Sequence, residues 1–306
     1  MMNQTTLAKP VKTNGVGLHT GVEVNLTLRP APENTGYIFV RTDLDNFEIP
    51  ASVEYISHCS YATTLMRRGV VLSTCEHLLS ALRGFGVDNC FIELDNIEIP
   101  IMDGSSEDFV ELIAKAGIVE QDSPRHTFRI LERVEVELGN RKMSIEPAEN
   151  FEIDCTIDFP HPFIERQTFI YVENNGRTGR PLTQAVLAGS FSKEIASART
   201  FGFTHEIDML RKANLALGGS LDNAIVLTED GMLNETPLRF DDEFVRHKIL
   251  DIIGDFALLG MPIQGKITAE RSGHSVHASL MSKLLKAEHA WEIVESKKSP
   301  LNQPVS

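Results

Sequence analysis

Apolar and polar positions alternate along the first part of the chain. The segments at 22–28, 37–40 and 47–50 follow a two-residue period, and a turn rich in Pro, Asn and Gly separates the first two. Strict alternation is typical of a strand with one buried face. The sequence therefore predicts a β-sheet within residues 5–55.

The segment at 72–84 is the first candidate helix. We expect Ser73 or Thr74 to cap it and Gly84 or Gly86 to end it, because these residue types are favoured at helix termini. The pattern then predicts a strand at 89–94, a loop at 100–105 and a second helix from about 106 to 117.

The second half of the chain repeats this order. Strands are predicted at 128–138, 142–146, 151–159, 167–172 and 265–270, and helices near 183–195, at 241–260 and at 275–294. In each half a set of strands leads to a His-bearing helix, one more strand and a last helix. We therefore predict an α+β fold made of two duplicated units, each a sheet with two helices.

Polar segments suggest the domain boundaries. Residues 120–125 are polar and contain a proline, so we expect them to link a first domain at 1–122 to a second domain at 126–296. The polar tail at 297–306 is expected to fray.

Composition limits the possible functions. The 306 residues, 42% hydrophobic and 24% charged, suffice for one large domain or two ordinary ones. A formal charge of −14 without any basic run argues against a nucleic-acid partner. The four cysteines form no C-x-x-C pair, and no apolar run approaches the length of a membrane span. We expect a reduced, soluble and cytoplasmic protein.

The predicted helix at 241–260 holds the first candidate chemistry. Its residues His247, Asp251 and Asp255 stand four apart, so their side chains project along one face. An imidazole and a carboxylate one turn apart can hold a metal ion, and a second carboxylate can orient a ligand. The alternative is a surface pair of the kind that many soluble helices carry.

Two further histidines are candidates for the same chemistry. If His77 binds a metal, its neighbour Glu76 is placed to act as a general base on a water. Alternatively, Glu76 favours the helix dipole in a first turn that His77 helps to cap. With His247 and Asp251, His77 would complete a two-imidazole, one-carboxylate set. His274 lies in a Gly-flanked turn and can serve as a general acid, although such loop histidines are commonly just solvated.

Six motifs in the chain resemble those of one enzyme family. They are GVGLHTG at 15–21, STCEHLLSAL at 73–82, EIPIMDGS at 98–105, ARTFGF at 198–203, FVRHK with LD and GD at 244–255, and SGH at 272–274. In this order they resemble the UDP-3-O-acyl-N-acetylglucosamine deacetylases, zinc amidases that commit a sugar nucleotide to lipid A synthesis. The resemblance implies a pair of β-α-α-β layers with the active site between them.

The resemblance also implies roles for individual residues. Zinc would be bound by His77, His247 and Asp251, although ferrous iron suits the same donors. The general base would be Glu76. The general acid would be His274, with Asp255 supporting its charged form, and Thr200 would help to stabilise the oxyanion. Because Glu76 must be ionised while His274 is charged, a bell-shaped pH profile is expected.

Substrate contacts can be placed by the same resemblance. Lys248 and Phe201 lie in motifs beside the active site, Phe159 corresponds to an aromatic residue that stacks on uracil, and Lys248 and Arg271 are candidates for the diphosphate. A segment at 159–182 corresponds to an inserted β-α-β excursion that walls the acyl-chain passage. The candidate lining residues of that passage, each with ordinary core as the alternative, are Ile164, Phe169, Tyr171, Val186, Leu187 and Ile195.

The chain departs from the family pattern at two positions. Arg271 stands where relatives often have Lys, which keeps the charge but changes the geometry offered to a diphosphate. His277 stands where relatives often have Asn, one turn after His274 on the last predicted helix. We expect His277 to face solvent; the alternative is that it faces the cleft and perturbs the pKa of His274.

Two other functions remain open at this point. A hydrolase with the same metal set could act on another acylated sugar, because the ligands alone do not select the substrate. A catalytically silent relative could serve as a scaffold, although the presence of Glu76, His77, His247, Asp251 and His274 argues against it. The expected partner is a small-molecule substrate, and the expected state is a monomer.

Overall fold

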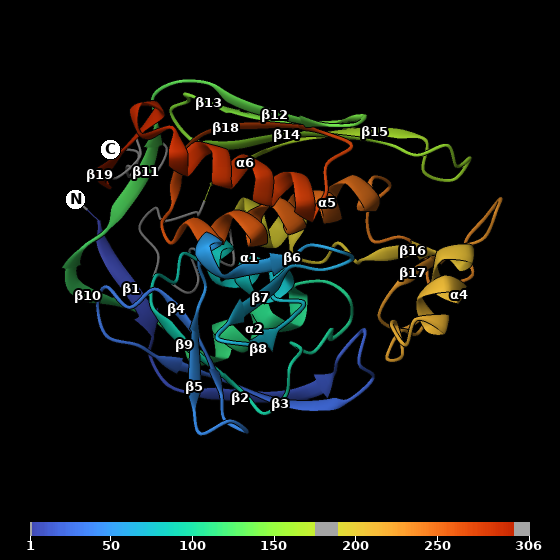
Figure 1. Cartoon of the computed structure of the whole chain (residues 1–306), viewed down its shortest axis with the longest axis horizontal. Helices are drawn as coiled ribbons and strands as arrows, with labels where there is room; N and C mark the ends of the chain where they lie inside the picture. Colours follow the sequence, from blue (N-terminus) through green and yellow to red (C-terminus); the bar gives the residue numbers. More distant parts are fainter. Residues whose placement is uncertain (1, 175–188, 297–306) are drawn as a thin grey trace.

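The computed structural model describes residues 2–174 and 189–296 (Figure 1). Two large β-sheets lie on opposite sides of a layer of helices. The buried side chains of the helices and of both sheets form one hydrophobic core. The α+β prediction is confirmed. The division into two domains at residues 122–126 stays a prediction.

The first sheet is built from the N-terminal residues. Its strand order is β2 (Val11–Val16), β3 (Glu23–Pro30), β9 (Cys90–Leu94), β4 (Tyr37–Arg41) and β5 (Phe47–Pro50). Along β3, Leu26 and Leu28 are fully buried while Asn25 between its buried neighbours is exposed, as the alternating pattern predicted. A short 3-10 turn, Val53–Tyr55, leads to a three-stranded sheet of β6 (Ile56–His58), β7 (Thr64–Arg67) and β8 (Val70–Leu72), which the pattern did not predict.

The second sheet has seven strands. Its main path is β12 (Val134–Leu138), β13 (Arg141–Glu146), β18 (Ile263–Glu270), β11 (His126–Ile130) and β19 (Trp291–Glu295), and β14 (Phe151–Asp158) joins β15 (Arg166–Val172) to β18. The single strand predicted at 128–138 is therefore wrong, because the chain breaks after Ile130 and continues as β12. Of the segment at 159–182, the structure describes β15 and the turn before it; residues 175–182 lie outside the described residues.

One prediction about the end of an element is wrong, and one polar segment forms a strand that the pattern did not predict. The last helix stops at Lys286, and after a 3-10 turn at Glu288–Ala290 the chain forms β19, where Trp291 stacks on Phe128 with ring centroids 4.5 Å apart. The polar segment at 120–125 is mostly strand, because β10 (Ile118–Pro124) pairs antiparallel with β1 (Asn3–Leu7). Its role as a domain linker stays a prediction. Backbone pairing does not require apolar side chains, so the pattern gave no signal of it.

The helical layer contains α1 (Glu76–Gly84), α2 (Glu107–Ala116), α5 (Glu243–Phe256) and α6 (His274–Lys286). A 3-10 turn, Ala257–Leu259, extends α5 until Gly260 adopts a left-handed conformation with φ +79°. The N-cap of α1 is Cys75, without a side-chain hydrogen bond, so the expected cap by Ser73 or Thr74 is wrong. The Thr74 hydroxyl instead donates to Glu98 Oε1 at 2.9 Å.

A glycine lets the two central helices touch. A Cβ atom placed on Gly254 of α5 would lie 2.0 Å from the carbonyl oxygen of Glu76 on α1, a distance that no packing can tolerate without movement of the backbone. This close approach aligns the face of α5 with the first turn of α1.

We predict that Gly254→Ala lowers the free energy of unfolding by about 1–3 kcal/mol, because the added methyl group forces α1 and α5 apart. Urea unfolding measures this change. Gly231→Ala is the matched control, since the nearest atom to its added Cβ is 3.7 Å away, and we expect a change within about 0.5 kcal/mol. Equal stabilities for the two variants would contradict the proposed close contact.

Most of the region between residue 195 and α5 was not predicted by the pattern. It comprises β16 (Phe201–Phe203), α4 (Thr204–Lys212) and β17 (Ile225–Leu227), which form the projection at the right of Figure 1 and follow a π-helical turn at Phe191–Ile195. No residue of α4 is buried, so the helix has no apolar stripe to mark it in the sequence. The helix predicted near 183–195 is described only from residue 189, where its end is the π-helical turn.

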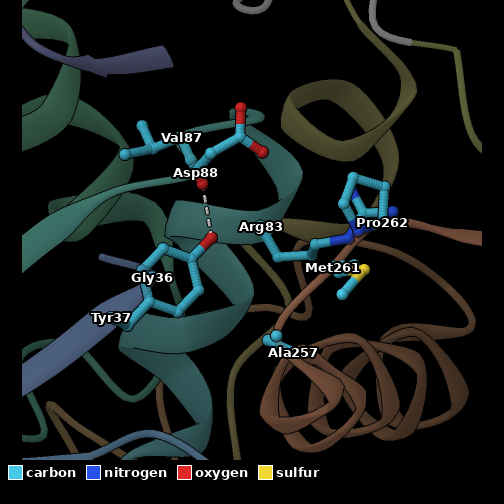
Figure 2. A pocket seen from close by; sticks show the side chains of 9 residues that line it. Gly36, Tyr37, Arg83, Val87, Asp88, Ala257, Met261 and Pro262 are labelled. Carbon is cyan, nitrogen blue, oxygen red and sulfur yellow. Dashed lines mark hydrogen bonds between the residues drawn. The ribbon is translucent and has the colours of Figure 1, made fainter. Parts of the chain in front are cut away.

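A cavity near the carboxyl ends of α1 and α5 is too small for a substrate. Arg83, Tyr37 and Met261 are among its lining residues, and its volume of about 20 Å³ admits about one water molecule (Figure 2). Arg83 lies seven residues after Glu76, so the cavity is roughly 10 Å along α1 from the helix start. Within the described residues, no helix is both long and apolar enough to cross a membrane.

Candidate active site

The packing of α1 on α5 brings three sequence-predicted residues together. Nε2 of His77 lies 3.7 Å from Asp251 Oδ1, and Nε2 of His247 lies 3.4 Å from the same oxygen. The two imidazole rings meet edge to face with centroids 5.0 Å apart. These three buried side chains form a group whose ligand atoms could hold a metal ion.

Neighbouring groups fix the orientation of these donors. His247 Nδ1 lies 3.0 Å from the carbonyl oxygen of Ala198, which accepts its hydrogen and leaves Nε2 free toward Asp251. Lys248 donates to Asp251 Oδ2 at 2.9 Å, so Oδ1 is the oxygen that faces the imidazoles. This arrangement of outer partners is common around metal-binding histidines.

The protonation states also fit a metal ion. Burial lowers the pKa of His77 to about 3, with help from the nearby His247, and burial likewise lowers the pKa of His247. Burial opposes the charged form of Asp251, but Lys248 and then His247 outweigh it and hold the pKa of that carboxyl well below its usual range. At neutral pH the set therefore offers two neutral imidazoles and one carboxylate, the forms that bind metals.

Glu76 lies beside this set at the start of α1. Its side chain is buried, Oε2 accepts a hydrogen bond from the backbone N–H of Thr63 at 3.2 Å, and Oε1 is 3.8 Å from His274 Nε2. Burial raises the pKa of Glu76 to about 8, although the charge of His274 opposes the shift. The carboxyl group is thus held where its proton affinity is high enough for acid–base chemistry.

His274 is paired with Asp255. Its Nδ1 lies 2.7 Å from Asp255 Oδ2, and Asp255 Oδ1 accepts from the hydroxyl of Thr63 at 2.6 Å. Burial opposes the imidazolium, but Asp255 outweighs it and raises the pKa of His274 to about 10. Burial likewise opposes the Asp255 carboxylate, and His274 outweighs it and lowers the pKa of that carboxyl to about 2. The two form a charged pair at neutral pH.

The expectation that His277 faces solvent is wrong. Its side chain is fully buried, and its Nδ1 lies 2.7 Å from Asp255 Oδ2, the same oxygen that His274 contacts. The helical spacing placed His277 one turn from His274 correctly, but it could not show that α5 covers that face of α6.

The predicted substrate residues fall into two groups. Phe159 and Phe201 meet edge to face with centroids 5.7 Å apart, Phe201 is 6.4 Å from the His247 ring, and Lys248 Nζ lies 5.3 Å from the Phe201 centroid. These residues adjoin the His–Asp set. By contrast, Arg271 forms an ion pair with Asp158.

Thr200 directly precedes Phe201, and backbone hydrogen bonds hold it in place. Its N–H donates to the carbonyl of Gly104 at 2.8 Å, and its own carbonyl accepts from Ile225 at 2.8 Å. Its position in the chain therefore puts it next to the aromatic residues of the site.

The candidate acyl-chain lining residues are mostly core. Ile164, Tyr171 and Ile195 are buried at 3%, 1% and 0% exposure, which favours the core alternative for each. Phe169 packs under the guanidinium of Arg246, 3.9 Å from its ring centroid. Val186 and Leu187 lie outside the described residues.

Thr63 is a site residue that the sequence did not reveal. Its hydroxyl lies 3.3 Å from His274 Nδ1 as well as 2.6 Å from Asp255, and its N–H binds Glu76. No spacing relates it to these residues, because it precedes a different strand and reaches them only through tertiary packing.

The fold and site together define an α+β protein in which two helices present a buried His, His and Asp donor set beside a glutamate and a histidine–aspartate pair. The chain belongs to the UDP-3-O-acyl N-acetylglycosamine deacetylase family, whose profile matches residues 4–286. A Coxiella burnetii (strain CbuK_Q154) protein named UDP-3-O-acyl-N-acetylglucosamine deacetylase is 49% identical over 298 residues, which cover 97% of this chain and 95% of that one. A Hahella chejuensis protein of the same name is 46% identical over 295 residues, 96% and 94% of the two chains.

Proposed function

We propose that this protein is a zinc-dependent deacetylase in lipid A biosynthesis. It would hydrolyse the N-acetyl group of UDP-3-O-[(3R)-3-hydroxyacyl]-N-acetylglucosamine to give acetate and UDP-3-O-acyl-glucosamine. The observation that carries the proposal is the convergence of His77, His247 and Asp251 beside Glu76 and His274 in a chain of this family. The names of the Coxiella and Hahella relatives support the substrate.

The metal would be held by His77, His247 and Asp251, whose protonation states and orientation fit it. A zinc ion bound there would supply Lewis acidity to the amide carbonyl and the attacking water, and its charge would favour the ionised form of Glu76. Ferrous iron suits the same donors.

The chain's own residues would move the protons. Glu76 accepts a proton from the attacking water, which adds to the acetamide carbonyl carbon. Thr200 assists the oxygen of that carbonyl as negative charge develops on it. His274 then donates its Nε2 proton to the departing amine nitrogen, and the carbon–nitrogen bond breaks to give acetate and the amino sugar. Asp255 keeps His274 charged until that step.

The nucleotide part of the substrate would lie on the aromatic side of the site. Phe159 is placed to stack on uracil, and Phe201 and Lys248 adjoin it beside His247. Lys248 and Arg271 are proposed to contact the diphosphate, the first as a point charge and the second as a fork. Since Arg271 is paired with Asp158, phosphate binding would have to share or replace that ion pair.

We place the protein in the cytoplasm as a monomer. The cytoplasmic location fits its four cysteines, all of which are free thiols.

Acetate release from the UDP-linked substrate tests the proposed function. We expect kcat/KM to exceed that for an acylated N-acetylglucosamine without the nucleotide by at least about 100-fold, because the diphosphate and uracil contacts are lost. Comparable values for the two compounds would favour an amidase for another acylated sugar. Metal binding without acetate release from either would favour a silent scaffold.

The pH profile tests the role of His274. Because the acid must be charged to donate, kcat/KM is expected to fall about tenfold per unit as the pH rises through the pKa of His274, near 10 in the free protein. The measurement is kcat/KM between pH 6 and 11 on protein shown to stay folded. His274→Ala should lose this basic limb along with most activity; a variant that keeps the limb would assign it to another group.

A further inference from the structure

Three donors converge on the Asp255 carboxylate. Nδ1 of His274 and Nδ1 of His277 each lie 2.7 Å from Oδ2, and the hydroxyl of Thr63 donates to Oδ1 at 2.6 Å. His274 and His277 occupy successive turns of α6, and their rings are edge to face with centroids 5.8 Å apart. The deacetylation described above uses His274 and Asp255 but gives His277 no part.

The hydrogen-bond partners of His277 indicate which ring nitrogen carries the hydrogen. A carboxylate only accepts hydrogen bonds, so Nδ1 must carry the hydrogen that points to Asp255. The other ring nitrogen, Nε2, lies 3.2 Å from Ser272 Oγ, whose hydroxyl can donate to it. A neutral His277 with its hydrogen on Nδ1 therefore satisfies both contacts. Its Nδ1 donates to Asp255, and its Nε2 accepts from the Ser272 hydroxyl, so the ring needs no second proton.

The surroundings also favour the neutral form. Burial lowers the pKa of His277, and although Asp255 opposes this shift, the charge of His274 adds to it. The titratable groups around the ring are Asp255 on α5, His274 on its own helix and, further away, Asp251; Phe256 of α5 supplies an apolar neighbour. One carboxylate cannot compensate two buried imidazolium ions, so the charge resides on His274.

We propose that His277 is a positioning residue: a permanently neutral imidazole that ties Asp255 to α6 and shares Oδ2 with His274. The inference rests on the proposed function, in which the Nε2 proton of His274 moves to the departing amine. His277 keeps its own proton throughout. Because its N–H also donates to Oδ2, the interaction of Asp255 with the His274 imidazolium is weaker. His274 therefore releases its proton more readily than it would beside a carboxylate that it did not share.

Removing the shared hydrogen bond changes two measurable quantities. Without the His277 donor, Asp255 interacts more strongly with His274, which favours the imidazolium. In His277→Phe, which keeps a ring of similar size, we expect the basic limb of kcat/KM to move up by about 0.5–1 pH unit. We also expect kcat to fall about 5–50-fold with KM changed by less than about threefold, because His277 does not touch the substrate.

Two amide variants separate a shared hydrogen bond from simple packing. The side-chain nitrogen of Asn falls where His has Nδ1, whereas that of Gln falls near Nε2. His277→Asn should therefore retain the bond to Asp255 and restore the wild-type basic limb, while His277→Gln should behave as His277→Phe does. Wild-type pH profiles for both His277→Phe and His277→Gln would overturn the proposal, as would a His277→Asn profile shifted like that of Phe.

Nitrogen NMR of the metal-loaded protein with 15N-labelled histidine tests the proton directly. We expect His277 to show a protonated Nδ1 and an unprotonated Nε2 from pH 6 to 9, while His274 shows two protonated nitrogens. A charged His277, or a hydrogen on Nε2, would overturn the inference. Because this measurement needs no substrate, it decides the role of His277 at Asp255 even if no acetate is released and the proposed function fails, and it does so even if the Phe variant does not fold.

Discussion

Stripping the metal from the protein is expected to abolish acetate release, with a loss of at least about 100-fold, and about one equivalent of zinc per chain should restore it. His77, His247 and Asp251 are all buried, and their protonation states are those that bind a metal. Among the described residues, the carboxylate oxygen within 4 Å of the two imidazoles is the shared Asp251 Oδ1. Without the ion, Glu76 also retains a pKa near 8 and is largely protonated at neutral pH. Both effects remove activity together.

Variants locate the metal in this experiment. His247→Ala should bind less than about 0.1 equivalent of zinc and lose activity, because a set of two remaining donors binds zinc far more weakly. The matched control is His289→Ala, since His289 is an exposed histidine outside the site; it should keep zinc and activity unchanged. Full activity in protein with no detectable metal would refute a metal-dependent mechanism.

The parts of the fold that the sequence predicted share a clear burial pattern. Strand β3 alternates and α5 carries an apolar stripe, so the sequence marks a buried face on each element. On α5 the polar side with His247, Asp251 and Asp255 is buried as well, which the stripe does not show. The elements that were not predicted include some whose side chains are not sorted in this way. Strand β10 is largely exposed and α4 buries no residue, so only backbone pairing and tertiary contact define them.

The same difference separates the site residues that the sequence predicted from those that only the structure shows. His247 and Asp251 are on one helix, where spacing alone places them on one face. His77 was a candidate third donor from its residue type, and the family motifs implied the same role. By contrast, Thr63 and Asp255 are 192 residues apart in the sequence, and their hydrogen bond depends on how α5 packs against the loop before β7. His277 was misplaced for the same reason, because the face of a helix is visible in the sequence but its covering element is not.

Four histidines in this small volume differ in charge because their neighbours differ. Burial acts on all of them against the charged form. His77 and His247 face Asp251, whose charge Lys248 already offsets. His274 and His277 share Asp255, which has no lysine or arginine partner among the described ion pairs, but only His274 also lies beside Glu76, 3.8 Å from its Nε2. The residue type is the same in all four, and the fold divides them into candidate metal ligands, a proposed acid and a proposed neutral hydrogen-bond donor.

Glu76→Gln is expected to lower kcat by about 10²–10⁴-fold while the protein still binds zinc and stays folded. Glutamine keeps the size of Glu76 and its side-chain oxygen can still accept from the Thr63 N–H, but it cannot take a proton from water. The substitution also removes a buried carboxyl group whose charged form burial disfavours, so thermal stability should be equal or higher. Acetate release, bound zinc and Tm measure the three consequences on the same preparation.

Glu107→Gln is the matched control for this prediction. Glu107 occupies the first turn of α2 as Glu76 occupies the first turn of α1, but its side chain is half exposed and its ionic partner is Arg239. We expect its kcat to remain within about twofold of wild type, because it lies outside the proton pathway. If Glu76→Gln kept more than about a tenth of the wild-type kcat with zinc bound, Glu76 would not be the base, and the proton of the attacking water would have to pass to another group. His274 is the nearest alternative, since its Nε2 lies 3.8 Å from the Glu76 carboxylate, and in that case the basic limb of the pH profile would become an acidic one.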